Sequence, residues 1–164
     1  EAEGVARFRL VEVLFTINDP VGVQELKDIF NNYPTLTPDV ALLLATHGDW
    51  EATQYLRNRL ARREDPTEAN LRYRARNAAA LLQGGDPSAM AVFQEFLRSD
   101  DTTITNLVFE LMTDLGQPRM ITLLQPSIEN VNNEFAINAC KTVISLALPE
   151  FRERILQYRE EFSD

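Results

Sequence analysis

The stretch LLQGGDPSAM, residues 81–90, places two glycines, an aspartate and a proline between two apolar runs. Glycine commonly ends a helix, and proline suits the first helical turn, where its missing N–H loses no hydrogen bond. An acid or amide just before such a proline, here Asp86, can accept hydrogen bonds from the free N–H groups of the new helix. The stretch therefore predicts one helix end and one helix start, joined by a tight turn.

Four other breaks in the chain look similar: INDP (17–20), HGDW (47–50), LGQP (115–118) and LALP (146–149). We take the third residue of each break as a reference position, which gives Asp19, Asp49, Asp86, Gln117 and Leu148. The intervals between them are 30, 37, 31 and 31 residues. Proline follows the reference residue in four breaks, and Trp50 follows it in the second.

The columns around these references are apolar. Five residues before the reference stand Leu14, Leu44, Leu81, Met112 and Val143, and seven residues after it stand Leu26, Leu56, Phe93, Leu124 and Ile155. Eleven residues after it stand Phe30, Leu60, Leu97, Ile128 and then Arg159. Apolar residues recur at helical spacing throughout, and no sustained alternation appears. The pattern predicts an all-α chain of about five stacked helical hairpins, roughly 5–31, 38–63, 68–98, 102–130 and 132–162.

Two repeat families place a short GD turn between paired helices. In tetratricopeptide repeats the unit has 34 residues and a small residue follows the aspartate by four. Here Ala52 and Ala89 follow Asp49 and Asp86 by three. This pattern resembles short HEAT-like repeats of the phycobilisome-lyase type, most closely in GGDPSAMAVFQEFLRSDD (84–101). The resemblance implies one armadillo-like domain over 1–164, a right-handed α-solenoid whose second helices line the concave face.

Composition narrows the classes of function. The 164 residues carry a formal net charge of −9, which argues against a nucleic-acid binder, including a HEAT-like DNA glycosylase. The single cysteine excludes an internal disulfide and a cysteine-based zinc site. No apolar run approaches the length of a membrane span. The first residue is Glu rather than Met, from which we expect a processed chain or an excised domain of unknown compartment.

The sequence shows no combination of residues that would form a catalytic site. His47 is the only histidine, and without partners at metal-ligand spacing we expect it to be a half-buried turn residue near the end of a first helix. Cys140 shares a column with Val11, Ala41, Ala78 and Phe109, so we expect a core residue rather than a nucleophile. We therefore predict no enzymatic activity, no cofactor and no metal.

Two irregular features are candidates for binding. Trp50 either packs on the neighbouring turn or is an exposed aromatic anchor. Seven arginines fall within 57–76, where they form either a patch for an anion or an acidic partner, or intramolecular pairs with Glu51, Glu64, Asp65 and Glu68: Arg57, Arg59, Arg62, Arg63, Arg72, Arg74 and Arg76. Asn77 lies in an otherwise apolar column, where a buried amide could fix the register.

The second helices also carry a polar stripe at five, nine and thirteen residues after the reference. Its members are Gln24, Asp28, Asn32, Gln54, Asn58, Arg62, Ala91, Glu95, Ser99, Thr122, Pro126, Asn130, Glu153 and Gln157. Such a ladder could bind an extended peptide or could simply be solvated. Pro126 is expected to kink or divide the helix predicted at 118–130.

From these features we expect a non-enzymatic scaffold that binds a protein or peptide partner. The candidate partner-binding residues are Trp50, Gln54, Asn58, Arg62, Arg63, Arg72, Arg76 and Glu95. The alternative is a subunit of a lyase-type enzyme that handles a tetrapyrrole chromophore. The predicted helix 149–162 looks like a cap with one apolar side. Apolar residues nearly encircle the helix predicted at 5–17, so we expect either a preceding segment of a longer chain or a partner against it.

Overall fold

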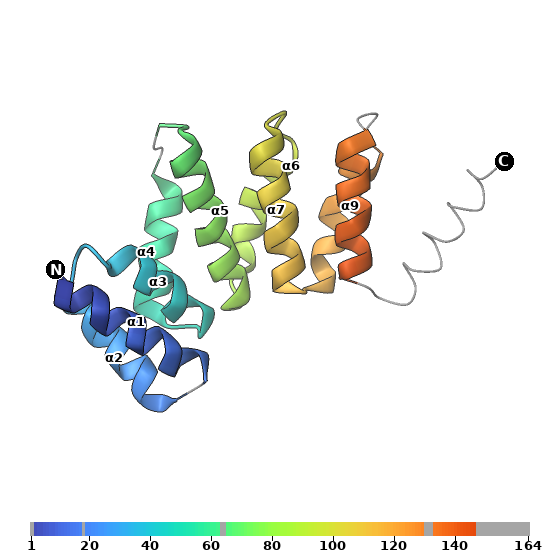
Figure 1. Ribbon diagram of the computed structural model, residues 1–164. Coiled ribbons are helices and arrows are strands. Elements are labelled where there is room, and N and C mark those ends of the chain that lie inside the picture. Colours follow the sequence, from blue (N-terminus) through green and yellow to red (C-terminus); the bar gives the residue numbers. More distant parts are fainter. Residues whose placement is uncertain (1, 18, 63–64, 130–132, 147–164) are drawn as a thin grey trace. The chain divides into compact units, whose positions relative to one another are not determined.

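The structure is a computed structural model that describes residues 2–17, 19–62, 65–129 and 133–146. All regular elements in these ranges are helical, and no strand occurs among them, as the apolar spacing predicts. The helix predicted at 149–162 lies outside the described residues. Figure 1 shows the helices, which are α1 (Ala2–Thr16), α2 (Pro20–Asn32), α3 (Thr37–Thr46), α4 (Trp50–Ala61), α5 (Glu68–Gln83), α6 (Met90–Leu97), α7 (Thr102–Leu115), α8 (Ile121–Ile128) and α9 (Asn133–Ser145).

Two predicted helices begin differently from expectation. Short 3₁₀ turns, η1 (Pro87–Ala89) and η2 (Pro118–Met120), precede α6 and α8, so each proline opens a 3₁₀ turn rather than the α-helix itself. The division of the segment 118–130 therefore falls at Met120 and not at Pro126. The helix α8 runs through Pro126 and ends two residues later.

The chain forms two compact units. Unit 1 comprises Glu1–Glu64 and Arg76–Ser88, and unit 2 comprises Asp65–Ala75 and Ala89–Asp164. The helix α5 contributes its first half to unit 2 and its second half to unit 1.

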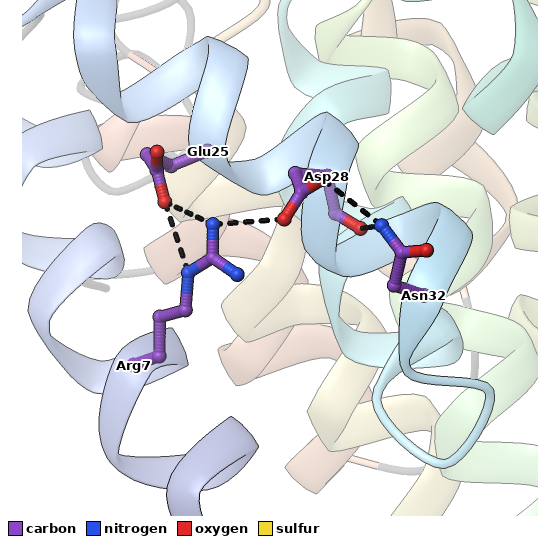
Figure 2. Close-up of polar contacts among 4 residues, drawn as sticks. All are labelled: Arg7, Glu25, Asp28 and Asn32. Atoms are coloured by element: carbon purple, nitrogen blue, oxygen red, sulfur yellow. Dashed lines mark hydrogen bonds and ion pairs between the residues drawn. The ribbon is translucent and has the colours of Figure 1, made fainter.

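In unit 1, α1 packs on α2, α2 on α3, and α3 on α4. The first contact is close because Gly22 has no side chain: a Cβ there would lie 2.7 Å from the backbone nitrogen of Phe15. Figure 2 shows the polar clamp across this pair, in which Arg7 Nε donates to Glu25 Oε2 at 2.9 Å and Arg7 Nη2 lies 2.8 Å from Asp28 Oδ2. Asn32 Nδ2 in turn donates to Asp28 Oδ1 at 2.9 Å.

In unit 2, α6 packs on both α7 and α8, and α9 packs on both α7 and α8. The two first helices of the predicted hairpins, α7 and α9, therefore lie side by side, and so do the two second helices, α6 and α8. Thr105 adds a polar link, since its hydroxyl donates to the carbonyl of Phe96 at 3.2 Å.

Two of the three apolar columns are buried as the sequence predicts, whereas the column eleven residues after the reference is only half-buried, at Phe30, Leu60, Leu97 and Ile128. Seven residues after each reference, the side chains are fully buried: Leu26, Leu56, Phe93 and Leu124. Five residues before it, the side chains are at most 1% exposed in Leu44, Leu81, Met112 and Val143, whereas Leu14 is half-buried. The columns five residues before and seven residues after the reference therefore form the core of both units, except at Leu14 on α1.

Three successive turns are built alike. The backbone N–H groups of Asp19, Asp49 and Asp86 donate to the carbonyls five residues back, at 3.0, 3.2 and 2.8 Å. Each aspartate side chain then accepts a hydrogen bond from the first turn of the following element, on Val21, Ala52 and Ser88 respectively. These caps satisfy helix N–H groups that would otherwise have no partner.

The predicted cap at Gln117 is wrong. The Gln117 side chain makes no capping hydrogen bond, and its Oε1 instead accepts from Arg119 Nε at 2.9 Å. The longer amide side chain reaches an arginine head group rather than the nearby backbone N–H groups.

Two of the cap aspartates also bind a basic residue of an earlier helix. Lys27 Nζ lies 2.9 Å from Asp49 Oδ2, and Arg57 Nε lies 2.6 Å from Asp86 Oδ2. Lys27 and Arg57 both stand eight residues after their own reference aspartate. Lys27 therefore links the middle of α2 to the start of α4, and Arg57 links α4 to the turn at Asp86, both within unit 1. We call these two contacts the cap pairs.

Gly84 is required by a close backbone approach at the end of α5. A Cβ on this residue would lie 1.9 Å from the carbonyl oxygen of Ala45 at the end of α3. The neighbouring Gly85 differs, since it has open space around it and a φ of +92°, a left-handed conformation that favours glycine.

We expect Gly84→Ala to lower the free energy of unfolding by about 3 kcal/mol, because two backbones must move apart to admit the methyl group. Gly85→Ala is the matched control and should lose only about 1 kcal/mol, the cost of a left-handed alanine. Urea unfolding of both variants measures the difference. A Gly84→Ala variant as stable as Gly85→Ala would contradict this close approach.

Candidate functional site

Trp50 is the first residue of α4 and is strongly exposed. The α3 helix ends at Thr46, Gly48 turns the chain with a φ of +73°, and Asp49 caps α4 through the Ala52 N–H. Trp50 thus occupies the position that proline holds in the other turns, and 71% of its surface is accessible. Of the two sequence interpretations, the structure agrees with an exposed aromatic side chain and not with packing on the neighbouring turn.

An open hollow of about 550 Å³ lies beside Trp50 in unit 1. Its lining includes Val23 and Lys27 of α2 together with His47, Asp49 and Glu51. The hollow therefore combines an aromatic ring, a short apolar side chain and charges of both signs, which is a composition suited to recognising a peptide.

Within this hollow, the pKa values of Asp49 and Lys27, which form a cap pair, differ from their ordinary values. Burial raises the pKa of Asp49, but the hydrogen bond from the Ala52 N–H and the Lys27 ammonium together outweigh it, so the net pKa is lowered. The hydrogen bond with Asp49 raises the pKa of Lys27 in turn. Both groups therefore stay charged at neutral pH, and the pair holds α2 against the start of α4.

His47 and Cys140 differ somewhat from their expected environments. The His47 ring lies against Phe15 with the ring centroids 4.2 Å apart, yet the residue is exposed rather than half-buried. Cys140 is half-buried rather than in the core, and burial raises the pKa of its thiol. Within the described ranges, no three histidine, cysteine, aspartate or glutamate side chains come together as a metal site.

Four of the predicted binding residues lie along α4 at steps of four. Trp50, Gln54, Asn58 and Arg62 follow the helix from its first residue to its C-cap, and we call this set the α4 stripe. Gln54 is half-buried, and the other three are exposed. Because residues four apart are neighbours on a helix surface, the α4 stripe is one continuous strip of unit 1.

The arginines of 57–76 are divided between the two units. Arg57, Arg59, Arg62 and Arg76 belong to unit 1, Arg72 and Arg74 belong to unit 2, and Arg63 lies outside the described residues. Arg72 binds an expected partner, Glu68, at 2.9 Å, whereas Arg57 binds Asp86, which was not among the expected partners. Arg62 and Arg76 are exposed.

Arg74 binds the predicted site residue Glu95 through both oxygens, at 3.2 and 3.1 Å. Its guanidinium carbon also lies 5.3 Å from the centre of the Phe96 ring. Glu95 is therefore already bound by Arg74 within unit 2. Asp28, which like Glu95 stands nine residues after its reference, is bound by Arg7 and Asn32 in unit 1.

Asn77 is buried as predicted, with 1% of its surface exposed, and its Oδ1 has no hydrogen-bond partner among the described residues. That Asn77 fixes the register of the irregular repeat unit stays a prediction.

The sequence analysis missed a polar hollow of about 400 Å³ between α7 and α9 in unit 2. Asn138 Nδ2 donates to Asn106 Oδ1 across it at 2.9 Å, and Glu110, Asp114 and Lys141 lie on its wall. The signal was present, because Asn106, Glu110 and Asp114 recur at steps of four on a first helix.

Neither a protein-family model nor a curated protein sequence matches this chain. Across the part of the chain that the structure describes, no helix combines the length and apolarity needed to cross a membrane.

Trp50 is the only tryptophan, so its fluorescence reports directly on this site. We expect a red-shifted emission that iodide quenches readily, because the ring is in water. We also expect Trp50→Ala to change the free energy of unfolding by no more than about 0.5 kcal/mol. A blue-shifted emission that resists quenching would show that the ring is packed.

The cap pair at Asp86 should make stability depend on pH. The hydrogen bond from Arg57 lowers the pKa of Asp86 by more than burial raises it. A carboxyl with a lowered folded-state pKa contributes stability that is present above its unfolded pKa, about 3.9, and is lost as the pH falls through its folded value. Asp86→Asn should therefore be less stable than the parent chain at pH 7, and the gap should narrow below about pH 4.

Urea unfolding at a series of pH values measures this gap. The matched control is Asp100→Asn, which removes an exposed carboxyl and should follow the parent chain at every pH. A stability gap for Asp86→Asn that is constant with pH would refute the assignment.

Proposed function

We propose that this chain is a non-enzymatic protein-interaction scaffold of the HEAT-like α-solenoid type, and that it binds an extended peptide segment of a partner along the α4 stripe. The observation that carries the proposal is the exposure of Trp50 at one end of that stripe, beside a hollow. A large aromatic ring left in water at the start of a helix is typical of a binding hot spot.

The solenoid part of the proposal is supported by the regular columns and turns. Equivalent columns are buried in both units, and three turns share the same backbone hydrogen bond. Within unit 2, the neighbouring helices pair first with first and second with second. Such packing is expected when helical hairpins stack on one another.

The α4 stripe suggests the chemistry of the peptide. From Trp50 to Arg62 the helix rises by about 18 Å, which corresponds to roughly six residues of extended chain. An apolar side chain would lie against Trp50, the peptide backbone would bond the amides of Gln54 and Asn58, and an acidic side chain would meet Arg62.

The cap pair at Asp49 gives the site rigidity. The Asp49 side chain both caps α4 and binds Lys27, so the backbone that carries Trp50 is held from two sides. A preorganised aromatic anchor loses less entropy on binding than a mobile one.

Display of random hexapeptides against the whole chain tests the proposal. We expect enrichment of peptides with an apolar residue near one end and an acidic residue near the other. Trp50→Ala should weaken the enriched peptides at least about tenfold, as expected for a hot spot. Arg62→Glu should weaken them by roughly fivefold or more, in a salt-dependent way.

Two control variants locate the site. Arg98→Glu makes the same charge change at the exposed C-cap of α6, and Ile144→Ala removes another exposed apolar side chain. Both should bind within about twofold of the parent chain. Failure to enrich any peptide, or binding that neither Trp50→Ala nor Arg62→Glu weakens, would refute the α4 stripe as the binding site.

A further inference from the structure

An apolar strip lies open on α1 and the turn that follows it. Leu10 is 71% exposed, Val13 61% and Ile17 66%, and Val21 continues the strip at the start of α2. We call these four residues the α1 stripe. Of the eight large apolar residues that are exposed in the described part of the chain, five fall between residues 5 and 21. Water-exposed apolar residues so concentrated indicate an interaction surface.

The positions equivalent to Leu10 and Val13 on later helices are covered. Leu10 stands nine residues before its reference, and the residues at that position elsewhere are at most 1% exposed: Val40, Asn77, Val108 and Ala139. The counterparts of Val13 are buried or half-buried: Leu43, Ala80, Leu111 and Thr142. At Leu10 and Val13 the α1 stripe therefore has the character of a helix-packing face, but nothing among the described residues covers these two side chains.

The spacing of the stripe fits a helical occupant. Leu10, Val13 and Ile17 follow each other by three and four residues, which is the seam of paired helices. The most extensive exposed apolar seam on the described part of this chain is the α1 stripe itself. A second copy of the chain would therefore supply a surface of matching shape and chemistry.

The charges beside the stripe also permit contact between copies. Arg9 and Glu12 flank it and pair with each other at 3.0 Å, while Arg7 is turned to Glu25 and Asp28 of α2. The chain as a whole carries a net charge of −9, so most approaches between two copies are repulsive. Beside Leu10 and Val13 the Arg9–Glu12 pair is locally balanced, which reduces that repulsion at this part of the face.

We propose that a second copy of this chain docks on the α1 stripe through its own α1, with the two helices antiparallel about a two-fold axis. Such an interface is isologous and closes at the dimer. The stripe is short, so the dimer belongs to the weak, concentration-dependent class. The inference does not rest on the proposed function, because the α4 stripe takes no part in it.

Sedimentation equilibrium of the whole chain from about 10 μM to about 1 mM tests the dimer. We expect the average mass to rise from monomer toward dimer over this range. Leu10→Glu and Val13→Glu should each weaken the dimer at least about tenfold, because each buries a charge where an apolar side chain was packed. Urea unfolding at the lowest concentration checks that both variants are folded, as expected for exposed positions.

Ile144→Glu is the matched control, since it places the same charge on an exposed isoleucine of α9. This variant and Trp50→Ala should dimerise within about twofold of the parent chain. A parent chain that stays monomeric at every concentration would overturn the proposal and leave the stripe to a different partner. An unchanged dimer in both α1 variants, or an equal loss in Ile144→Glu, would also overturn it.

Discussion

The contact on which the rest of unit 1 depends is the cap pair, in which a base on a second helix binds the aspartate of a following turn. Lys27 binds Asp49 and Arg57 binds Asp86 with the same spacing from their references. Each aspartate also accepts a backbone N–H of its own helix or turn. One side chain thus joins local capping to tertiary packing, so the start of α4 is fixed relative to α2 and the turn at Asp86 is fixed relative to α4, both within unit 1.

The α4 stripe follows from this constraint. The Asp49 carboxylate sets the residue at which α4 begins, and the helical period then aligns Gln54, Asn58 and Arg62 behind Trp50. Tryptophan at a position that elsewhere holds proline adds an aromatic ring without disturbing the turn, because the cap is made by the preceding residue. A binding surface and a structural turn can therefore share the same few residues.

Much of the helical pattern could be read from the sequence, because burial and capping are local consequences of residue type and spacing. The exposure of Trp50 was not predictable from the sequence, since a local pattern does not show whether a neighbouring turn covers the ring. The partners of Arg57 and Arg74 lie 29 and 21 residues away, and only the folded chain brings them together. The cap predicted at Gln117 does not form, because the Gln117 side chain accepts a hydrogen bond from Arg119 instead. The bases eight residues after Asp19 and Asp49 were readable, but their role needed the structure.

Double-mutant cycles on the cap pairs test this account most directly. Lys27→Met with Asp49→Asn, and Arg57→Met with Asp86→Asn, give a coupling free energy for each pair from urea unfolding at pH 7. The account predicts that both couplings are favourable, exceed the roughly 0.5 kcal/mol scatter of independent sites, and shrink as salt is added. Additive losses in both cycles would contradict it, because the bases would then not hold the helix starts that they contact.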